Sequence, residues 1–390
     1  MNIKDQINVN FAYDFVKDCL MTKIFRLLSL YLLLFIPIVS FGQKIDWSVG
    51  MSSFFDNAEF GHSKVQIPQT MAGVHIAPRL AFSSNSVHSV NVGVDMLHEF
   101  GSVEFVNKFT PIAYYQYKKE PITFLMGAYP REFALKDAPR FLFYDSITYY
   151  RPMINGLLLK YEDDNGWVQT WMDWTSRQTQ TEREAFILGF AGKYSLGVFY
   201  LRDYTFMYHF AGTMDPAYSE ALHDNVISMT SFGVDLSDKT FFKKLDFNVG
   251  WAVTTERARS ESTGWLKHNG FISEATVQYK WLGVFNSFYA GEPHMAFYSE
   301  HSSELYWGDP FYRAKRYNRT DFYIDFMNSD IASLKLIYSL HACENTVYHQ
   351  QSLRLSVYIG KKDFGKQRNR TRENSRPPAP TEPPISNRPF

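Results

Sequence analysis

The sequence predicts an all-β protein: a transmembrane antiparallel β-barrel of about sixteen strands, preceded by a signal peptide. Three observations lead to this fold class. Aromatic residues make up 17% of the 390 residues, segments of alternating apolar and polar residues recur along the chain, and the links between these segments alternate in length. Transmembrane barrels combine aromatic girdles, alternating strands and connections that are short at one end and long at the other.

The two ends of the chain differ in character from its middle. Residues 21–42 begin at a second methionine, carry Lys23 and Arg26 before an apolar run, and finish on Ser40-Phe41-Gly42, as a secretory signal peptide does. A membrane helix is the alternative for this run, and Pro37 and the short length disfavour it. Residues 1–20 then form a misassigned start or an extension. Residues 365–390, rich in Arg and Pro, are expected to be a disordered periplasmic tail.

Residues 43–364 carry the predicted barrel. Between residues 245 and 253, for example, Leu, Phe, Val, Trp and Val alternate with Asp, Asn, Gly and Ala. Similar alternation occurs near residues 90–96, 322–326, 334–340 and 353–359. One face of each strand suits lipid and the other suits water, but a soluble β-sandwich alternates in the same way. Single strands therefore leave both fold classes open.

The links between the strands favour the barrel. Most of the shorter links span two to four residues, at 83–86, 118–120, 163–165, 195–196, 281–282 and 328–330, with a middling one at 237–243. Longer links fall between them, at 56–70, 101–108, 130–151, 176–182, 209–225, 257–269, 291–319 and 342–350. A barrel that has both termini and its short turns in the periplasm produces this regular alternation. A soluble β-sandwich does not require such an alternation of link length.

Charge and cysteine content exclude several function classes. The formal net charge is +0, which is unlike a nucleic-acid-binding protein, so no nucleic acid is expected as a partner. Cys19 precedes the predicted signal peptide, so the mature chain keeps Cys343 alone and has no intramolecular disulfide. The sequence has no zinc-ligand spacing, and we expect no metal and no cofactor.

At the level of architecture, residues 43–364 resemble the sixteen-stranded outer-membrane porin superfamily. The resemblance rests on the signal peptide, the strand count, the alternating links and a last strand that ends on Phe364. It departs from the usual pattern because some two dozen residues follow Phe364. The resemblance implies the outer membrane of a Gram-negative bacterium, contact with the lipid bilayer and lipopolysaccharide, and a homotrimer.

The porin resemblance also implies a pore constriction. In that superfamily the third long loop commonly folds inward, and here the third long link is residues 130–151. Its charged residues would set up a transverse field that sorts solutes, although a solvated surface loop is the competing interpretation. The expected constriction residues are Arg131, Lys136, Arg140, Asp145 and Arg151. Strand alternation separately places further charged side chains in the lumen: Asp95, Asp173, Asp246, Glu274, Asp321, Asp325, Lys335 and Arg354.

The leading expectation from the sequence is a porin-like channel, without enzymatic activity, for passive diffusion of small hydrophilic solutes such as sugars. Short motifs of hydrolases such as Gly-x-Ser-x-Gly and His-Glu-x-x-His are lacking. Two alternatives remain. One is a barrel enzyme that acts on envelope lipids or peptides, with a site near the extracellular strand ends, where His209, His294, His301 and His341 are expected. The other is a closed barrel that serves as an adhesin or scaffold.

Overall fold

The computed structural model describes residues 43–360, except residues 136, 219–220, 260–263 and 330. The predicted extension (1–20), signal peptide (21–42) and tail (365–390) lie outside the described residues. Within the described part of the chain, no helix is long and apolar enough to cross a membrane.

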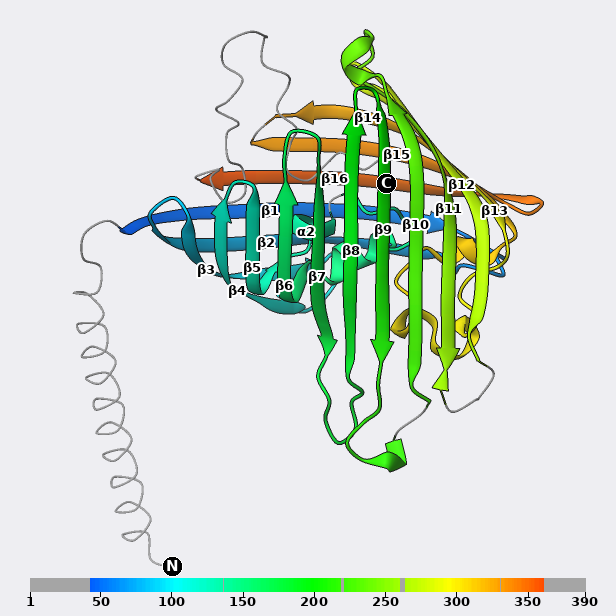
Figure 1. Ribbon diagram of the computed structural model, residues 1–390, viewed down its shortest axis with the longest axis horizontal. Coiled ribbons are helices and arrows are strands. Elements are labelled where there is room, and N and C mark those ends of the chain that lie inside the picture. Colours follow the sequence, from blue (N-terminus) through cyan, green and yellow to red (C-terminus); the bar gives the residue numbers. More distant parts are fainter. Residues whose placement is uncertain (1–42, 136, 219–220, 260–263, 330, 361–390) are drawn as a thin grey trace, which may run out of the picture.

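Over the described residues, sixteen antiparallel strands form a closed barrel, which confirms the predicted fold class and strand number. Each strand pairs with its neighbours in sequence, and β1 closes the barrel against β16. In Figure 1 the strands of the two walls cross, because strands tilt in a barrel. The strands are β1 (Gln43–Glu59), β2 (Gln69–Ser84), β3 (His88–Glu99), β4 (Lys108–Lys119), β5 (Ile122–Pro130), β6 (Met153–Glu162), β7 (Gly166–Ser176), β8 (Ala185–Leu196), β9 (Phe199–Phe210), β10 (His223–Asp235), β11 (Lys244–Ala258), β12 (Leu266–Tyr279), β13 (Leu282–Gly291), β14 (Arg316–Asn328), β15 (Ala332–Cys343) and β16 (Thr346–Gly360).

The side chains of each strand alternate between the interior and the outer face of the barrel. On β11, Asn248, Ala252 and Thr254 are buried, whereas the large apolar side chains Phe247 and Trp251 are 52% and 51% exposed. This arrangement is the reverse of a soluble protein, in which the apolar side chains lie inside. It is the arrangement expected of a wall that faces lipid.

The two ends of the barrel differ. Tight turns join β2 to β3, β4 to β5, β6 to β7, β8 to β9, β12 to β13 and β14 to β15, at the end where β1 begins and β16 finishes. We call this the short-turn end. The 3₁₀ helix η3 (Ser237–Lys239) lies in the β10–β11 connection at the same end. The longer connections, including the one with η2 (Pro216–Tyr218), lie at the opposite, long-loop end. The β15–β16 connection at that end is the exception: it holds only residues 344–345, so the longer link predicted at 342–350 is wrong, because both strands extend into it.

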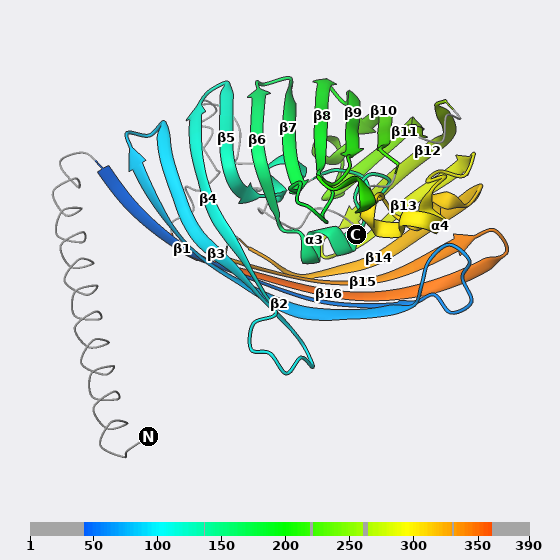
Figure 2. The same ribbon diagram turned by 90° about the horizontal axis from the view of Figure 1, so that it is seen from below.

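Two long-loop connections fold back into the barrel and fill much of it; we call residues 131–152 and 292–315 together the plug. Figure 2 shows α3 and α4 inside the ring of strands. The plug helices are α2 (Glu132–Leu135), α3 (Asp145–Tyr150), α4 (Tyr298–His301), η5 (Ser302–Glu304) and η6 (Pro310–Arg313). The plug side chains Phe141, Leu142 and Phe311 are at most 1% exposed. The main apolar core therefore lies inside the barrel, between the plug and the wall.

Hydrogen bonds and ion pairs hold the plug in place. The Tyr144 amide donates to the Trp307 carbonyl (2.6 Å), and the Asp309 amide donates to the Arg140 carbonyl (2.9 Å), so the two plug segments are joined. Arg140 also pairs with Asp145 (3.1 Å) and with Asp321 on β14 (3.3 Å). These buried pairs fix one arrangement of the plug, because breaking one would leave a buried charge without its partner.

Candidate active site

A histidine that is oriented by a carboxylate is the usual proton-transfer group of a hydrolase. Among the described residues, two histidines have a ring nitrogen hydrogen-bonded to a carboxylate. His75 Nδ1 lies 2.7 Å from Asp95 Oδ1, and His209 Nδ1 lies 2.8 Å from Asp224 Oδ1. The two pairs differ in their position in the barrel and in the contacts of the second ring nitrogen, Nε2.

The His75–Asp95 pair is a structural contact in the barrel interior. His75 is 6% exposed, and its second nitrogen, Nε2, lies 2.8 Å from the Tyr149 carbonyl at the end of α3. Asp95 and the Tyr149 carbonyl therefore contact one ring nitrogen each. His75 thus ties the plug to β2, and neither nitrogen is left to move a proton for a reaction.

The His209–Asp224 pair lies on the outer wall, near the long-loop end. Tyr208 and Phe210, which flank His209 on β9, are buried, so the intervening His209 side chain points outward. In the strand register Asp224 of β10 is directly opposite His209. The His209 side chain is 17% exposed. Its Nδ1 is held by Asp224, and Nε2 is the nitrogen available for proton transfer.

Two arginines neutralise Asp224. Arg257 Nε donates to Asp224 Oδ2 (2.8 Å), and Arg259 donates to both carboxylate oxygens (2.8 and 2.9 Å). Asp224 is buried, whereas the side chains of Arg257 and Arg259 are 35% and 44% exposed. Two guanidinium groups against one carboxylate leave an excess of positive charge beside His209. Their remaining N–H groups are suited to an anionic ligand.

Aromatic rings flank the pair on both sides in one row across the outer wall. The register aligns Trp174 with Phe186 and Phe186 with His209, and Asp224 with Arg257. The Phe186 and His209 ring centroids are 5.0 Å apart, and the Arg257 guanidinium lies 4.3 Å from the Trp265 ring centroid. Aromatic side chains on a barrel wall mark the level of the membrane interface. The row therefore flanks a histidine–carboxylate pair with aromatic rings near the long-loop end of the outer wall.

The other three histidines named from the sequence face the interior or the plug. His294, in the β13–β14 connection, is bonded to Thr254 and Tyr289, and burial lowers its pKa to about 3. His341 of β15 is fully buried and bonded to Tyr317 and Gln350. His301 lies on α4, with its ring 4.4 Å from that of His223.

The four described residues predicted for a pore constriction lie in the plug, and their charges are engaged by other groups. Arg131 pairs with Asp173 (2.7 Å), and Arg151 lies over the Trp307 ring. Arg140 pairs with Asp145 and Asp321. Burial acts to raise the pKa of Asp145, but Arg140, Arg354 and Arg319 together hold it below its usual value. Lys136 lies outside the described residues.

The residues predicted to face the lumen are inside the barrel, where most are paired. Asp246 accepts a hydrogen bond from the Tyr200 hydroxyl (2.9 Å). Asp95 is hydrogen-bonded to His75. Ion pairs engage the others: Asp173, Glu274, Asp321, Asp325, Lys335 and Arg354. Selection of solutes by these charges, or by a field across residues 131–151, stays a prediction.

One family model matches residues 41–363, and it describes a lipid A 3'-O-deacylase-type family. The chain belongs to this family. The match spans the whole described barrel, including the His209–Asp224 row and the plug. Among curated proteins, none matches the sequence significantly.

Family membership corrects one expectation from the sequence. The description of the family is that of an enzyme, so the expectation of a chain without enzymatic activity is wrong. That expectation rested on the lack of short hydrolase motifs. His209, Asp224 and Arg257 are on three different strands and become neighbours only through sheet pairing, so they leave no short motif in the sequence.

Solved outer-membrane proteins share the architecture of the chain. A loop-deletion mutant of OmpT from Vibrio cholerae has a TM-score of 0.51 and 9% identity, covering 82% of this chain and 100% of the other. In-vitro folded OmpT from Vibrio cholerae has a TM-score of 0.50 and 9% identity, covering 82% of this chain and 98% of the other. At this identity the likeness concerns the fold alone. With the closed barrel, it confirms the expected architecture and the outer-membrane location.

The sequence pointed to His209 but missed its partners Asp224, Arg257 and Arg259. The sequence does hold a clue to Asp224. His209 is one residue before the end of β9, and Asp224 is one residue after the start of β10. An antiparallel hairpin brings such positions together once its register is known. In the described part of the chain, no group of three or more His, Cys, Asp or Glu side chains is placed to hold a metal ion.

Proposed function

We propose that this protein hydrolyses the 3'-O-linked acyl ester of lipid A in the outer leaflet of the outer membrane. The observation that carries the proposal is the His209–Asp224 pair on the lipid-facing wall of a chain that belongs to a lipid A 3'-O-deacylase-type family. We place the short-turn end in the periplasm and the long-loop end at the cell surface, as is usual for such barrels. The pair is then level with the outer leaflet.

The location of the pair suits a lipid ester. The acyl esters of a glycolipid lie where its sugar headgroup meets the hydrocarbon of the bilayer. The rings of Trp174 and Phe186 support the same depth for His209, because aromatic rings of a barrel wall gather at this interface. A lipid substrate could approach His209 sideways from the leaflet, without entering the barrel.

The pair supplies general acid–base catalysis. Asp224 fixes the tautomer and orientation of the ring, so that His209 Nε2 accepts a proton from a water molecule. The oxygen of that water forms a bond to the ester carbonyl carbon, and the bond from this carbon to the sugar oxygen then breaks. His209 returns the proton to the sugar oxygen, so the products are a fatty acid and a free sugar hydroxyl. A positioned general base of this kind contributes about 10²–10⁴-fold to a rate.

Arg257 and Arg259 bind the anionic part of the substrate in this proposal. Lipid A carries phosphate groups on its sugars, and guanidinium groups bind phosphate through parallel N–H donors. Arg257 uses Nε on Asp224, and Arg259 uses Nε and Nη2, so each keeps further donors for a phosphate. The same excess of positive charge would attract an anionic headgroup to the row.

The filled interior of the barrel argues against passive diffusion and is compatible with ester hydrolysis at the outer wall. A diffusion channel needs a continuous aqueous path, and here two long connections fill the space between the walls with fully buried side chains such as Phe141, Leu142 and Phe311. Buried ion pairs attach these connections to β14 and β16. We therefore favour a barrel whose interior is a scaffold and whose outer wall carries the site.

The proposal is tested by the lipid A of a Gram-negative host that expresses the chain. Mass spectrometry of the extracted lipid A should show a species that has lost one ester-linked acyl chain. Cells that express the His209→Gln variant at the same outer-membrane level should retain the full set of acyl chains. Unchanged lipid A in cells with correctly inserted wild-type protein would refute the proposed function.

A further inference from the structure

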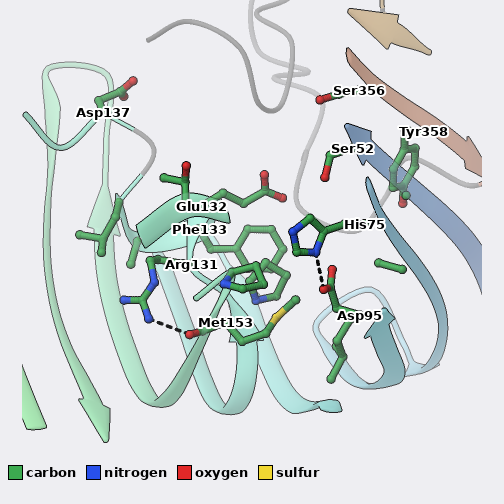
Figure 3. Close-up of a pocket in the computed structure, with 18 of the residues that line it drawn as sticks. Ser52, His75, Asp95, Arg131, Glu132, Phe133, Asp137, Met153, Ser356 and Tyr358 are labelled. Atoms are coloured by element: carbon green, nitrogen blue, oxygen red, sulfur yellow. Dashed lines mark hydrogen bonds and ion pairs between the residues drawn. The ribbon is translucent and has the colours of Figure 1, made fainter. Parts of the chain in front are cut away.

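A cavity of about 680 Å³ lies inside the barrel, on the side of the plug away from the long loops. Its lining includes Lys118, Thr123 and Glu162, which lie next to the tight turns of the short-turn end. Figure 3 shows the cavity between α2 of the plug and the wall that carries Ser52 and His75. A ligand would enter from the short-turn end, because the plug covers the other side.

The lining of the cavity combines apolar and polar groups. Plug residues Phe133, Leu135 and Ile147 contribute apolar surface. The wall contributes polar groups, among them Ser52 and Arg79. Such a surface suits a molecule with an apolar body and a charged or polar head.

Arg79 of β2 carries a charge in the cavity wall that no carboxylate among the described residues balances. Its Nε and Nη1 are buried and make no hydrogen bond. A buried donor without an acceptor costs about 1–3 kcal/mol, and more when the group is charged. Other cations of the lining are balanced: Arg131 by Asp173, Lys160 by Glu162 and Lys335 by Asp325.

Two polar groups on the neighbouring strands lie close to Arg79. Ser48 lies directly opposite Arg79 on β1, and its buried hydroxyl has no hydrogen-bond partner. The buried Tyr114 hydroxyl on β4 lies against the Arg79 side chain and interacts with it. On β3, Gly93 lies opposite Arg79, and the space that a side chain would occupy there is taken by the Pro78 carbonyl oxygen and the stem of Arg79. Ser48 and Tyr114 are not among the residues that line the cavity, so Arg79 is the group of this cluster that faces a ligand.

We propose that this cavity binds a small amphiphilic oxyanion, a carboxylate or a phosphate monoester that carries an apolar group, with Arg79 as its main ligand. An oxyanion supplies the negative charge that Arg79 lacks. Its apolar group would pack against Phe133 and Leu135. This site is separate from the His209–Asp224 row, and the proposal does not depend on the catalytic one.

The test is isothermal titration of the folded full chain in lipid nanodiscs with three probes of similar size. Benzoate and phenyl phosphate are the oxyanions, and benzyl alcohol is the neutral control. Saturable binding at millimolar concentration or tighter is expected for at least one oxyanion, with binding of benzyl alcohol at least about tenfold weaker, because charge-assisted hydrogen bonds supply the difference. Which oxyanion binds more tightly identifies the head group. No saturable binding, or equal binding of all three probes, would overturn the proposal.

Variants locate the site. Arg79→Gln should weaken oxyanion binding at least about tenfold, and Arg79→Lys should weaken it less, because lysine keeps the charge but loses the planar fork. Ser52→Trp fills the cavity without a change of charge and should also abolish binding, which tests the site even if Arg79→Gln does not fold. Lys280→Gln removes one charge from the same end of the barrel, outside the cavity lining, and should bind as the wild type does. Undiminished binding by Arg79→Gln or by Ser52→Trp would place the ligand elsewhere and contradict the proposal.

Discussion

The substitution His209→Gln tests the catalytic role of the histidine–carboxylate pair with little disturbance of the fold. Glutamine has a similar reach and can still bond to Asp224, but it cannot accept a proton at neutral pH. His209 is partly exposed and makes one polar side-chain contact, to Asp224 (2.8 Å), so the cost in stability should be below about 1 kcal/mol. Loss of a general base should lower kcat by about 10²–10⁴-fold, which corresponds to about 3–5 kcal/mol in the activation barrier.

The assay follows release of fatty acid from lipid A in mixed micelles by the purified variants, after electrophoresis of unboiled samples shows that each is folded. The matched control is His349→Gln. His349 is also an outer-wall histidine at the long-loop end, but it bonds to Tyr338 and lies on β16, far around the barrel from β9. It should keep wild-type activity. If His209→Gln retained more than about a tenth of wild-type kcat, the assignment of the general base would be wrong.

Three other changes have defined outcomes. Asp224→Asn should lower kcat by about 10²–10⁴-fold in the same assay, because an amide favours the wrong tautomer of His209; an undiminished rate would remove Asp224 from the mechanism. The double variant Arg257→Gln with Arg259→Gln should raise KM for phosphorylated lipid A and leave KM for an uncharged acyl ester unchanged, whereas an equal effect on both substrates would argue against phosphate binding. Asp145→Asn removes a carboxylate within 3.7 Å of three arginines and should destabilise the folded barrel by about 3–5 kcal/mol. The unboiled protein should then lose its compact electrophoretic form at a lower temperature than the wild type, and an unchanged temperature would contradict the role of these ion pairs.

The strands could be predicted from the sequence because the alternation of apolar and polar residues is a local property. The run at residues 245–253 falls inside β11, and the predicted number of strands is the observed one. The inward fold of residues 131–152 could be expected from the porin resemblance. The second plug segment, residues 292–315, could not, because its place depends on contacts such as Tyr144 with Trp307 between loops far apart in sequence.

The candidate active site was less predictable than the fold for a related reason. His209 could be singled out by its residue type and its place near a long link. Its contact with Asp224 depends on the register of a hairpin whose connection holds residues 211–222. To place the aromatic and basic neighbours of this pair, the order of the strands from β7 to β11 must also be known. A site assembled from one residue per strand has no sequence motif, so the lack of motifs was misleading.

The most direct test of the central claim is the reaction of the purified wild-type protein with lipid A in water enriched in ¹⁸O. The account predicts that lipid A loses one ester-linked acyl chain, that the released fatty acid carries ¹⁸O in its carboxylate, and that the exposed sugar hydroxyl does not. This pattern requires attack of water on the ester carbonyl. Folded protein that releases no fatty acid, or that places ¹⁸O in the sugar, would contradict the account.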